Sequence, residues 1–147
     1  MRVLVVSEDA KERLRAASAL QLHAGAEVVE ADSAEMMRQF VIVDGSHFDV
    51  LVVDGDLQPR GGFATLYDLR ARAELSGSEP IASIVMMDRR QDAWLAGWAG
   101  ANDVVLKPVD PFDLAHRVAA LEHAEAVPYG DAGSDAGQLA AAIRDHR

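Results

Sequence analysis

The segment VLVVDGD, residues Val50–Asp56, is an apolar run that ends in two carboxylates separated by a glycine. Because β-branched residues dominate the run, it predicts a buried strand over Val50–Val53. Carboxylates avoid burial unless a cation or a hydrogen-bond donor meets them. The segment therefore either leaves the sheet into water or delivers Asp54 and Asp56 to a site that needs negative charge.

The composition is typical of one soluble domain. The chain has 147 residues, half of them hydrophobic, and contains no cysteine, which excludes disulfides and thiol chemistry. Its net charge of −10 disfavours binding to nucleic acid or to an anionic membrane surface. The apolar start MRVLVV is too short for a signal peptide or a membrane span, so we expect a cytoplasmic protein.

Four further apolar runs alternate with helical patterns along the chain. Strands are predicted over Val3–Val6, Glu27–Glu30, Ile81–Met87 and Val104–Leu106. Helices are predicted over Ala10–Leu22, Ala34–Val43, Phe63–Glu74, Asp92–Ala99 and from the N-cap Asp110 to about His123. This alternation predicts an α/β fold in which a doubly wound parallel sheet is covered by helices on both faces.

One domain is expected over residues 1–123. From Ala124 onward the sequence is rich in Gly, Ala and Asp, which is typical of a linker. Ser134 is a candidate N-cap for a short helix through Ile143. Residues 124–147 are therefore expected to form a linker and a short tail, with or without that helix.

Charged residues follow three of the predicted strands. Glu8 comes after the first strand, Asp54 and Asp56 after the third, and Lys107 after the fifth. In a doubly wound sheet, ligands bind beyond the carboxyl ends of the strands. Several carboxylates at that edge need a cation, and an oxygen-liganded ion such as Mg²⁺ suits them. One carboxylate could then act as a nucleophile toward a phosphoryl group, whose charge the metal and Lys107 would neutralise.

Three segments in this order carry a resemblance to a known family. They are VLVVSED at residues 3–9, FDVLVVDGDLQPRGG at residues 48–62 and GANDVVLKPVDPFDL at residues 100–114. Over residues 1 to about 123, the chain resembles the receiver domain of response regulators, which act in bacterial two-component phosphorelay signalling. The resemblance implies a flavodoxin-like (βα)5 sheet with strand order 2-1-3-4-5.

The resemblance also implies a role for each matched residue. Asp54 would accept a phosphoryl group from a sensor histidine kinase, and Lys107 would bind that group. Glu8, Asp54 and the backbone carbonyl of Asp56 would hold Mg²⁺. The peptide bond between Lys107 and Pro108 is expected to be cis.

The resemblance further implies how such a protein passes on its signal. No DNA-binding or enzymatic output domain follows the matched region, so we expect an atypical stand-alone receiver without enzymatic activity of its own. Output would then pass through partner proteins, through the tail or through self-association. A homodimer across the fourth helix, the fifth strand and the last helix is one such route.

Several positions depart from the pattern of the family. Where the family has Thr or Ser at the end of the fourth strand, this chain has Met87 or, one residue later, Asp88, and neither donates a hydroxyl hydrogen bond. Val104 replaces the aromatic switch residue, and Ser7 replaces one acid of the metal site. Glu8 is longer than the usual Asp. These departures keep a second hypothesis open, namely a receiver-like interaction module that works without phosphorylation.

Two further interpretations stay open at this point. A small phosphatase-like or flavodoxin-like enzyme is a third hypothesis, with Asp56 as general acid, but it is disfavoured because no cap segment is recognisable. Trp94 and Trp98 lie four residues apart on a predicted helix and share a face. Core packing is the favoured interpretation of this pair, and an exposed interaction surface is the alternative.

Overall fold

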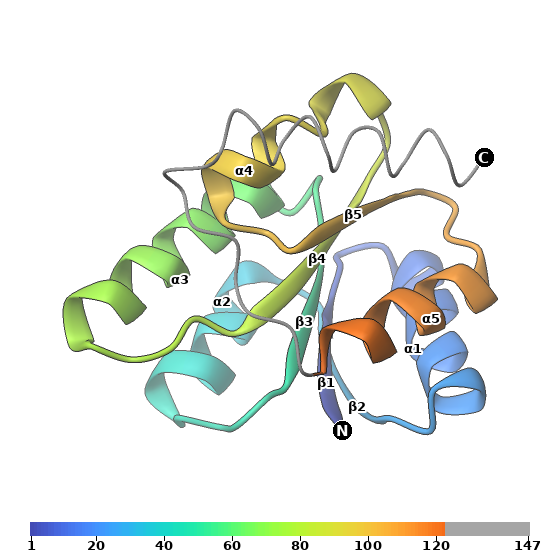
Figure 1. Ribbon diagram of the computed structural model, residues 1–147, viewed down its shortest axis with the longest axis horizontal. Coiled ribbons are helices and arrows are strands. Elements are labelled where there is room, and N and C mark those ends of the chain that lie inside the picture. The colour runs from blue at the N-terminus through green and yellow to red at the C-terminus, as the bar shows by residue number, and fades with distance from the viewer. Residues whose placement is uncertain (123–147) are drawn as a thin grey trace.

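The computed structural model describes residues 1–122 and contains a parallel five-stranded sheet between two layers of helices (Figure 1). The strands lie in the order β2-β1-β3-β4-β5, as predicted. The linker and tail predicted for residues 124–147 lie outside the described residues. The strands are β1 (Arg2–Val6), β2 (Glu27–Ala31), β3 (Val50–Asp54), β4 (Ala82–Met87) and β5 (Asp103–Leu106).

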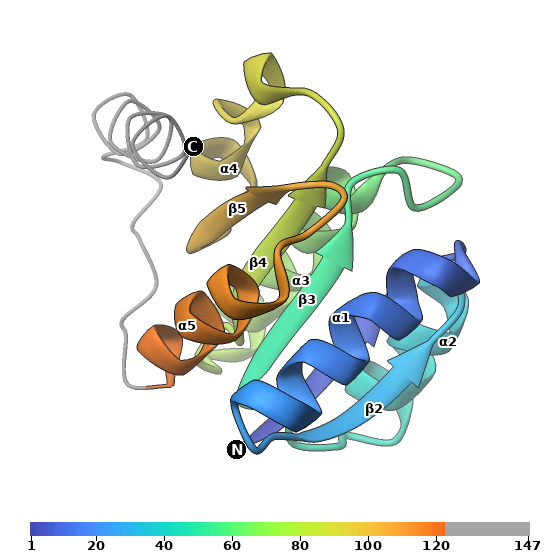
Figure 2. The same cartoon turned by 90° about the vertical axis from the view of Figure 1, so that its right-hand side faces the viewer.

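Helices cover both faces of the sheet, two on one face and three on the other (Figure 2). None of the helices within residues 1–122 is long and apolar enough to cross a membrane. One face of the sheet is covered by α1 (Ala10–His23) and α5 (Pro111–Leu121). The other face is covered by α2 (Ala34–Arg38), α3 (Gly62–Ser76) and α4 (Leu95–Ala99).

The central strands divide their side chains between two apolar cores. On β3, Val50 and Val52 pack in the core beneath α1 and α5, whereas Leu51 and Val53 pack in the core beneath α2, α3 and α4. Successive residues of a strand point to opposite faces of the sheet. A strand covered on both sides therefore needs an apolar residue at every position, which is the pattern in the sequence.

Two helical segments differ from the prediction. The second predicted helix ends at Arg38, and Gln39–Val43 continues as a π-helical turn rich in aromatic and β-branched residues, which are weak helix formers. Of the fourth predicted helix, Asp92–Ala99, only Leu95–Ala99 is α-helical (α4), and a 3₁₀ turn at Arg90–Asp92 precedes it. The helix α4 is followed by Gly100 in the left-handed conformation.

The register of the sheet brings the ends of distant strands to one edge. Val6 of β1 pairs with Val53 of β3, so the next residues, Ser7 and Asp54, lie side by side. The register of β4 against β5 places Lys107 at the same edge. The helix caps come from neighbouring residues, and Asp9 accepts hydrogen bonds from the first-turn amides of α1.

Candidate functional site

Asp54, the last residue of β3, is buried, and its two carboxylate oxygens accept three hydrogen bonds. The Lys107 ammonium donates to Oδ1 over 2.6 Å, and the backbone N–H of Asp56 donates to the same oxygen over 3.0 Å. The buried Ser7 hydroxyl donates to Oδ2 over 2.7 Å. This carboxylate can be buried because a cation and two further donors meet it.

Lys107 is the cation of the site, and three carboxylates surround its ammonium group. Its Nζ lies 2.6 Å from Asp54 Oδ1, 3.0 Å from Asp56 Oδ2 and 3.4 Å from Asp88 Oδ1. Burial by itself would lower the pKa of Lys107, but the hydrogen bonds and charges of Asp54 and Asp56 outweigh burial and raise this pKa. Lys107 is therefore charged at neutral pH.

Asp56 and Asp88 lie on the open side of the site, with side chains 65% and 55% exposed. A hydrogen bond between their carboxyl groups lowers the pKa of Asp56 and raises the pKa of Asp88. Lys107 lowers the pKa of Asp56 further, and burial raises the pKa of Asp88 further. Two carboxylates can lie this close together because Lys107 contacts both.

Glu8, the first acid expected at a metal site, is exposed. Its Oε1 accepts a hydrogen bond from the backbone N–H of Gln58 over 2.5 Å. Within residues 1–122, no three His, Asp or Glu side chains are arranged as a metal-binding cluster. The oxygen donors nevertheless fit Mg²⁺, which needs only one or two carboxylates and completes its shell with water and phosphate oxygens. Glu8, Asp54 and the carbonyl oxygen of Asp56 are the groups that would hold it.

The structure distinguishes the two candidates for the position after β4. Met87 is the last residue of the strand, and its side chain is buried in the core beneath α3. Asp88, the next residue, faces Lys107. Val104 of β5 is buried in the same core as Met87. At these positions the site has neither a hydroxyl nor an aromatic ring, and a carboxylate stands beside the lysine.

Two loops at this edge contain a cis peptide bond. The bond between Lys107 and Pro108, in the loop after β5, is cis as predicted. The bond between Gln58 and Pro59, in the loop after β3, is also cis, which the sequence analysis did not predict.

The structure adds two supporting residues, Gly62 and Arg13, which the sequence analysis did not single out. A Cβ atom at Gly62 would lie 2.3 Å from the carbonyl oxygen of Asp54, so only glycine lets α3 begin this close to β3. The glycine pair at residues 61–62 could have indicated this close approach, because it stands between the acidic loop and a predicted helix. Arg13 of α1 donates a hydrogen bond to the carbonyl oxygen of Ser7 over 2.8 Å and so supports the end of β1.

The two tryptophans have different surroundings. Trp98 stacks on Tyr67 of α3 with the ring centroids 4.6 Å apart, whereas Trp94 is 60% exposed. The expectation of core packing is therefore wrong for Trp94, because α4 begins only at Leu95 and Trp94 lies outside the helix. Trp98 and Asp88 both line a pocket of about 340 Å³ beside the carboxylates.

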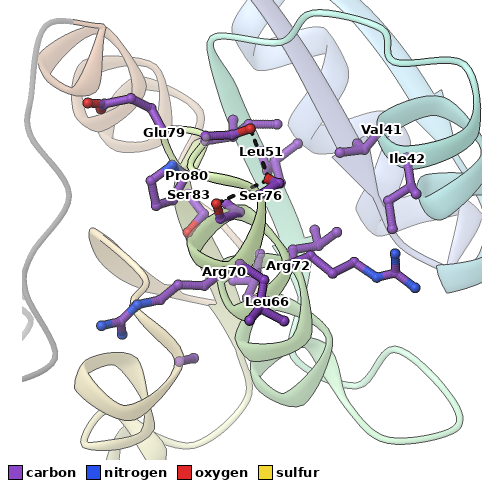
Figure 3. A pocket seen from close by; sticks show the side chains of 17 residues that line it. Val41, Ile42, Leu51, Leu66, Arg70, Arg72, Ser76, Glu79, Pro80 and Ser83 are labelled. Carbon is purple, nitrogen blue, oxygen red and sulfur yellow. Dashed lines mark hydrogen bonds between the residues drawn. The ribbon is translucent and has the colours of Figure 1, made fainter.

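A larger cavity, of about 640 Å³, lies away from the carboxylates (Figure 3). It is lined by Val41 and Ile42 of the π-helical turn, Leu66 of α3, Pro80, and Ser83 near the start of β4. Because the carboxylates gather beyond the last residues of β4, this cavity is at the opposite end of that strand and is not part of the acidic site.

Comparisons with known proteins identify the family. Residues 3–119 match the response regulator receiver domain family. The chain is 30% identical over 129 residues to the uncharacterized response regulatory protein Rv3143 of Mycobacterium tuberculosis, which covers 86% of this chain and 94% of that protein. The chain therefore belongs to the response regulator receiver domain family, whose members act in two-component signalling. Phosphorylation on an aspartate and binding of Mg²⁺ are general in this family.

Solved structures confirm the flavodoxin-like fold. A LuxR-family two-component response regulator from Aurantimonas sp. matches with a TM-score of 0.72 and 21% identity, over 97% of this chain and 96% of that chain. A chain of the co-crystal structure of the Saccharomyces cerevisiae histidine phosphotransfer protein Ypd1 with the receiver domain of Ssk1 matches with a TM-score of 0.69. Its identity is 18%, over 80% of this chain and 86% of that chain.

Proposed function

We propose that this protein is an atypical receiver that accepts a phosphoryl group on Asp54. The supporting observation is a buried carboxylate at the carboxyl end of β3 with the Lys107 ammonium 2.6 Å away. In the transfer, one Asp54 oxygen attacks phosphorus and forms a P–O bond, while the bond between phosphorus and the donor breaks. The electron pair of the broken bond leaves with the donor, either a kinase histidine or the acetate of acetyl phosphate.

The surrounding residues have separate roles in this proposal. Lys107 offsets the charge of the phosphoryl oxygens, and the Asp56 amide holds the Asp54 carboxyl group in place. Mg²⁺ bound by Glu8, Asp54 and the carbonyl of Asp56 would supply further positive charge to the same oxygens. Ser7 gives the metal site one negative charge fewer than an acid at this position would give.

We propose a sensor histidine kinase or a histidine phosphotransfer protein as the phosphoryl donor, with the protein in the cytoplasm. The yeast co-crystal structure, which pairs a histidine phosphotransfer protein with a receiver domain, supports this class of partner. Signal output would pass through protein contacts and not through catalysis by this chain. The M. tuberculosis protein supports a stand-alone receiver, because the match covers 94% of its length.

A homodimer is one form that such protein contacts would take. Its interface would use α4, β5 and α5, and the exposed Trp94 just before α4 supports this choice of face. Sedimentation at increasing protein concentration measures this association, and a Trp94→Ala variant is expected to weaken it.

A phosphorylation-independent interaction module is the second candidate function. It is favoured by the Asp88 carboxylate, which contacts Lys107 at the open side of the site, where it would repel an incoming phosphoryl group. It is also favoured by Met87, which is buried at the end of β4 and has no hydroxyl to offer.

Intact-mass spectrometry after incubation with acetyl phosphate and Mg²⁺ separates the two candidates. The expected result is one phosphoryl adduct on the wild-type protein and none on the Asp54→Asn variant. A Glu8→Gln variant is expected to need a higher Mg²⁺ concentration for the same labelling. If the wild-type protein is not labelled under conditions that label a known receiver, the phosphoacceptor proposal is wrong and the second candidate is preferred.

A further inference from the structure

Asp88 is the first residue after β4, and its carboxylate lies at the open side of the site. Its Oδ1 is 3.4 Å from the Lys107 ammonium, which also contacts the Asp56 carboxylate at 3.0 Å. The side chain is half exposed, so water and the neighbouring loop leave it room to move. Asp88 is therefore held at the site by the charge of Lys107 and not by packing.

Lys107 is shared by three carboxylates: its ammonium group hydrogen-bonds Asp54 and Asp56 and forms a longer ion pair with Asp88. A lysine ammonium group has three N–H donors, and three carboxylates lie within 2.6–3.4 Å of Nζ. A phosphoryl group attached to Asp54 would bring further oxygens that need one of these donors. Of the three carboxylates, those of Asp56 and Asp88 are exposed, and Asp88 makes the longest contact with Lys107. Asp88 is thus the partner that Lys107 gives up most readily.

We propose that Asp88 is the switch residue of this receiver and that it works by displacement. In the unphosphorylated protein the Asp88 carboxylate forms an ion pair with Lys107. A phosphoryl group on Asp54 takes over that contact and repels Asp88 outward. The signal is thus the release of a carboxylate and not the capture of a hydroxyl. This inference rests on the proposed phosphorylation of Asp54.

The segment after Asp88 connects this movement to the surface. Asp88 is followed by the 3₁₀ turn at Arg90–Asp92 and by Trp94, which is exposed at the start of α4. Trp98 lines the same pocket as Asp88 and stacks on Tyr67. Outward movement of Asp88 would therefore change the surroundings of Trp94 and Trp98.

The two tryptophans of the chain provide the readout, because both lie within ten residues of Asp88. Tryptophan emission and intact mass are recorded on the same samples before and after addition of acetyl phosphate and Mg²⁺. The test variant is Asp88→Asn, which keeps the size of the side chain and removes its charge. The matched control is Asp92→Asn, which removes a charge from the same loop at a residue that pairs with Arg89.

The wild-type protein and the Asp92→Asn control are expected to change their emission on phosphorylation. The Asp88→Asn variant is expected to be phosphorylated about tenfold faster, because one repelling charge is gone, and to lose most of the emission change. A full emission change in phosphorylated Asp88→Asn, or none in the phosphorylated wild type, overturns the displacement switch but leaves the phosphoacceptor function intact. Absence of a phosphoryl adduct on the wild-type protein overturns both.

Discussion

Replacing Lys107 by methionine is expected to destabilise the folded protein strongly. The ion pair with Asp54 has an N–O distance of 2.6 Å, and the two side chains are 8% and 5% exposed. Methionine fills a similar volume but leaves the Asp54 carboxylate buried with the Ser7 hydroxyl and the Asp56 amide as its remaining donors. Removing one partner of a buried ion pair typically costs about 3–5 kcal/mol, because the other charge stays buried without compensation.

Urea unfolding followed by tryptophan emission measures this change. A loss of that size would lower the unfolding midpoint by about 2 M, since proteins of this size have slopes of about 1–3 kcal/mol per M of urea. The double variant Lys107→Met/Asp54→Asn is the matched control. It is expected to recover about half of the loss, because the uncompensated charge is removed as well.

The pH dependence gives a second check on the same residue. The pKa of Lys107 is raised in the folded protein, so its stabilising effect is fully present below the unfolded pKa near 10.5 and is lost as the pH rises through the folded pKa. The stability difference between wild type and Lys107→Met should therefore be constant near neutral pH and shrink above pH ~10.5. A loss below about 1 kcal/mol, or no recovery in the double variant, would show that the pair behaves as an exposed one and would refute the reasoning.

Two further substitutions test the framework of the site. Gly62→Ala would place a Cβ atom 2.3 Å from the Asp54 carbonyl oxygen, so thermal unfolding should show a loss of at least about 1–3 kcal/mol, and a neutral result would contradict the close approach. Arg117→Met would leave two aspartates without the buried guanidinium that binds both, at an expected cost of about 3 kcal/mol in urea unfolding, whereas an unchanged midpoint would mean that this network contributes little.

The main features of the fold followed from local patterns in the sequence. The uninterrupted apolar run at Val50–Val53 predicted a strand buried on both faces, and the structure confirms it. The helix from Ala34 was predicted too long, because periodicity alone does not distinguish an α-helix from the π-helical turn that follows Arg38. Trp94 was expected in the core, but α4 starts after it and leaves its ring in solvent.

The candidate site shows the same division between local pattern and tertiary contact. The positions of Asp54 and Lys107 at strand ends could be predicted, because a parallel sheet brings such ends to one edge. The partners of Glu8 could not be predicted, since its bond to the Gln58 amide depends on how two loops fold toward each other. The roles of Met87 and Asp88 stayed open for a similar reason, because a shift by one residue exchanges the core and the site.

Local sequence patterns were enough to predict a doubly wound parallel sheet with carboxylates and a lysine at one edge. They could do so because strand patterns and charges after strands depend on near neighbours in the chain. The sharing of Lys107 by Asp54, Asp56 and Asp88, and the hydrogen bond from the Ser7 hydroxyl to Asp54, became visible only in the tertiary structure. These contacts join residues up to 53 positions apart, so they depend on strand register and on loop paths. Burial then sets their strength, because it removes the water that would otherwise solvate each charge.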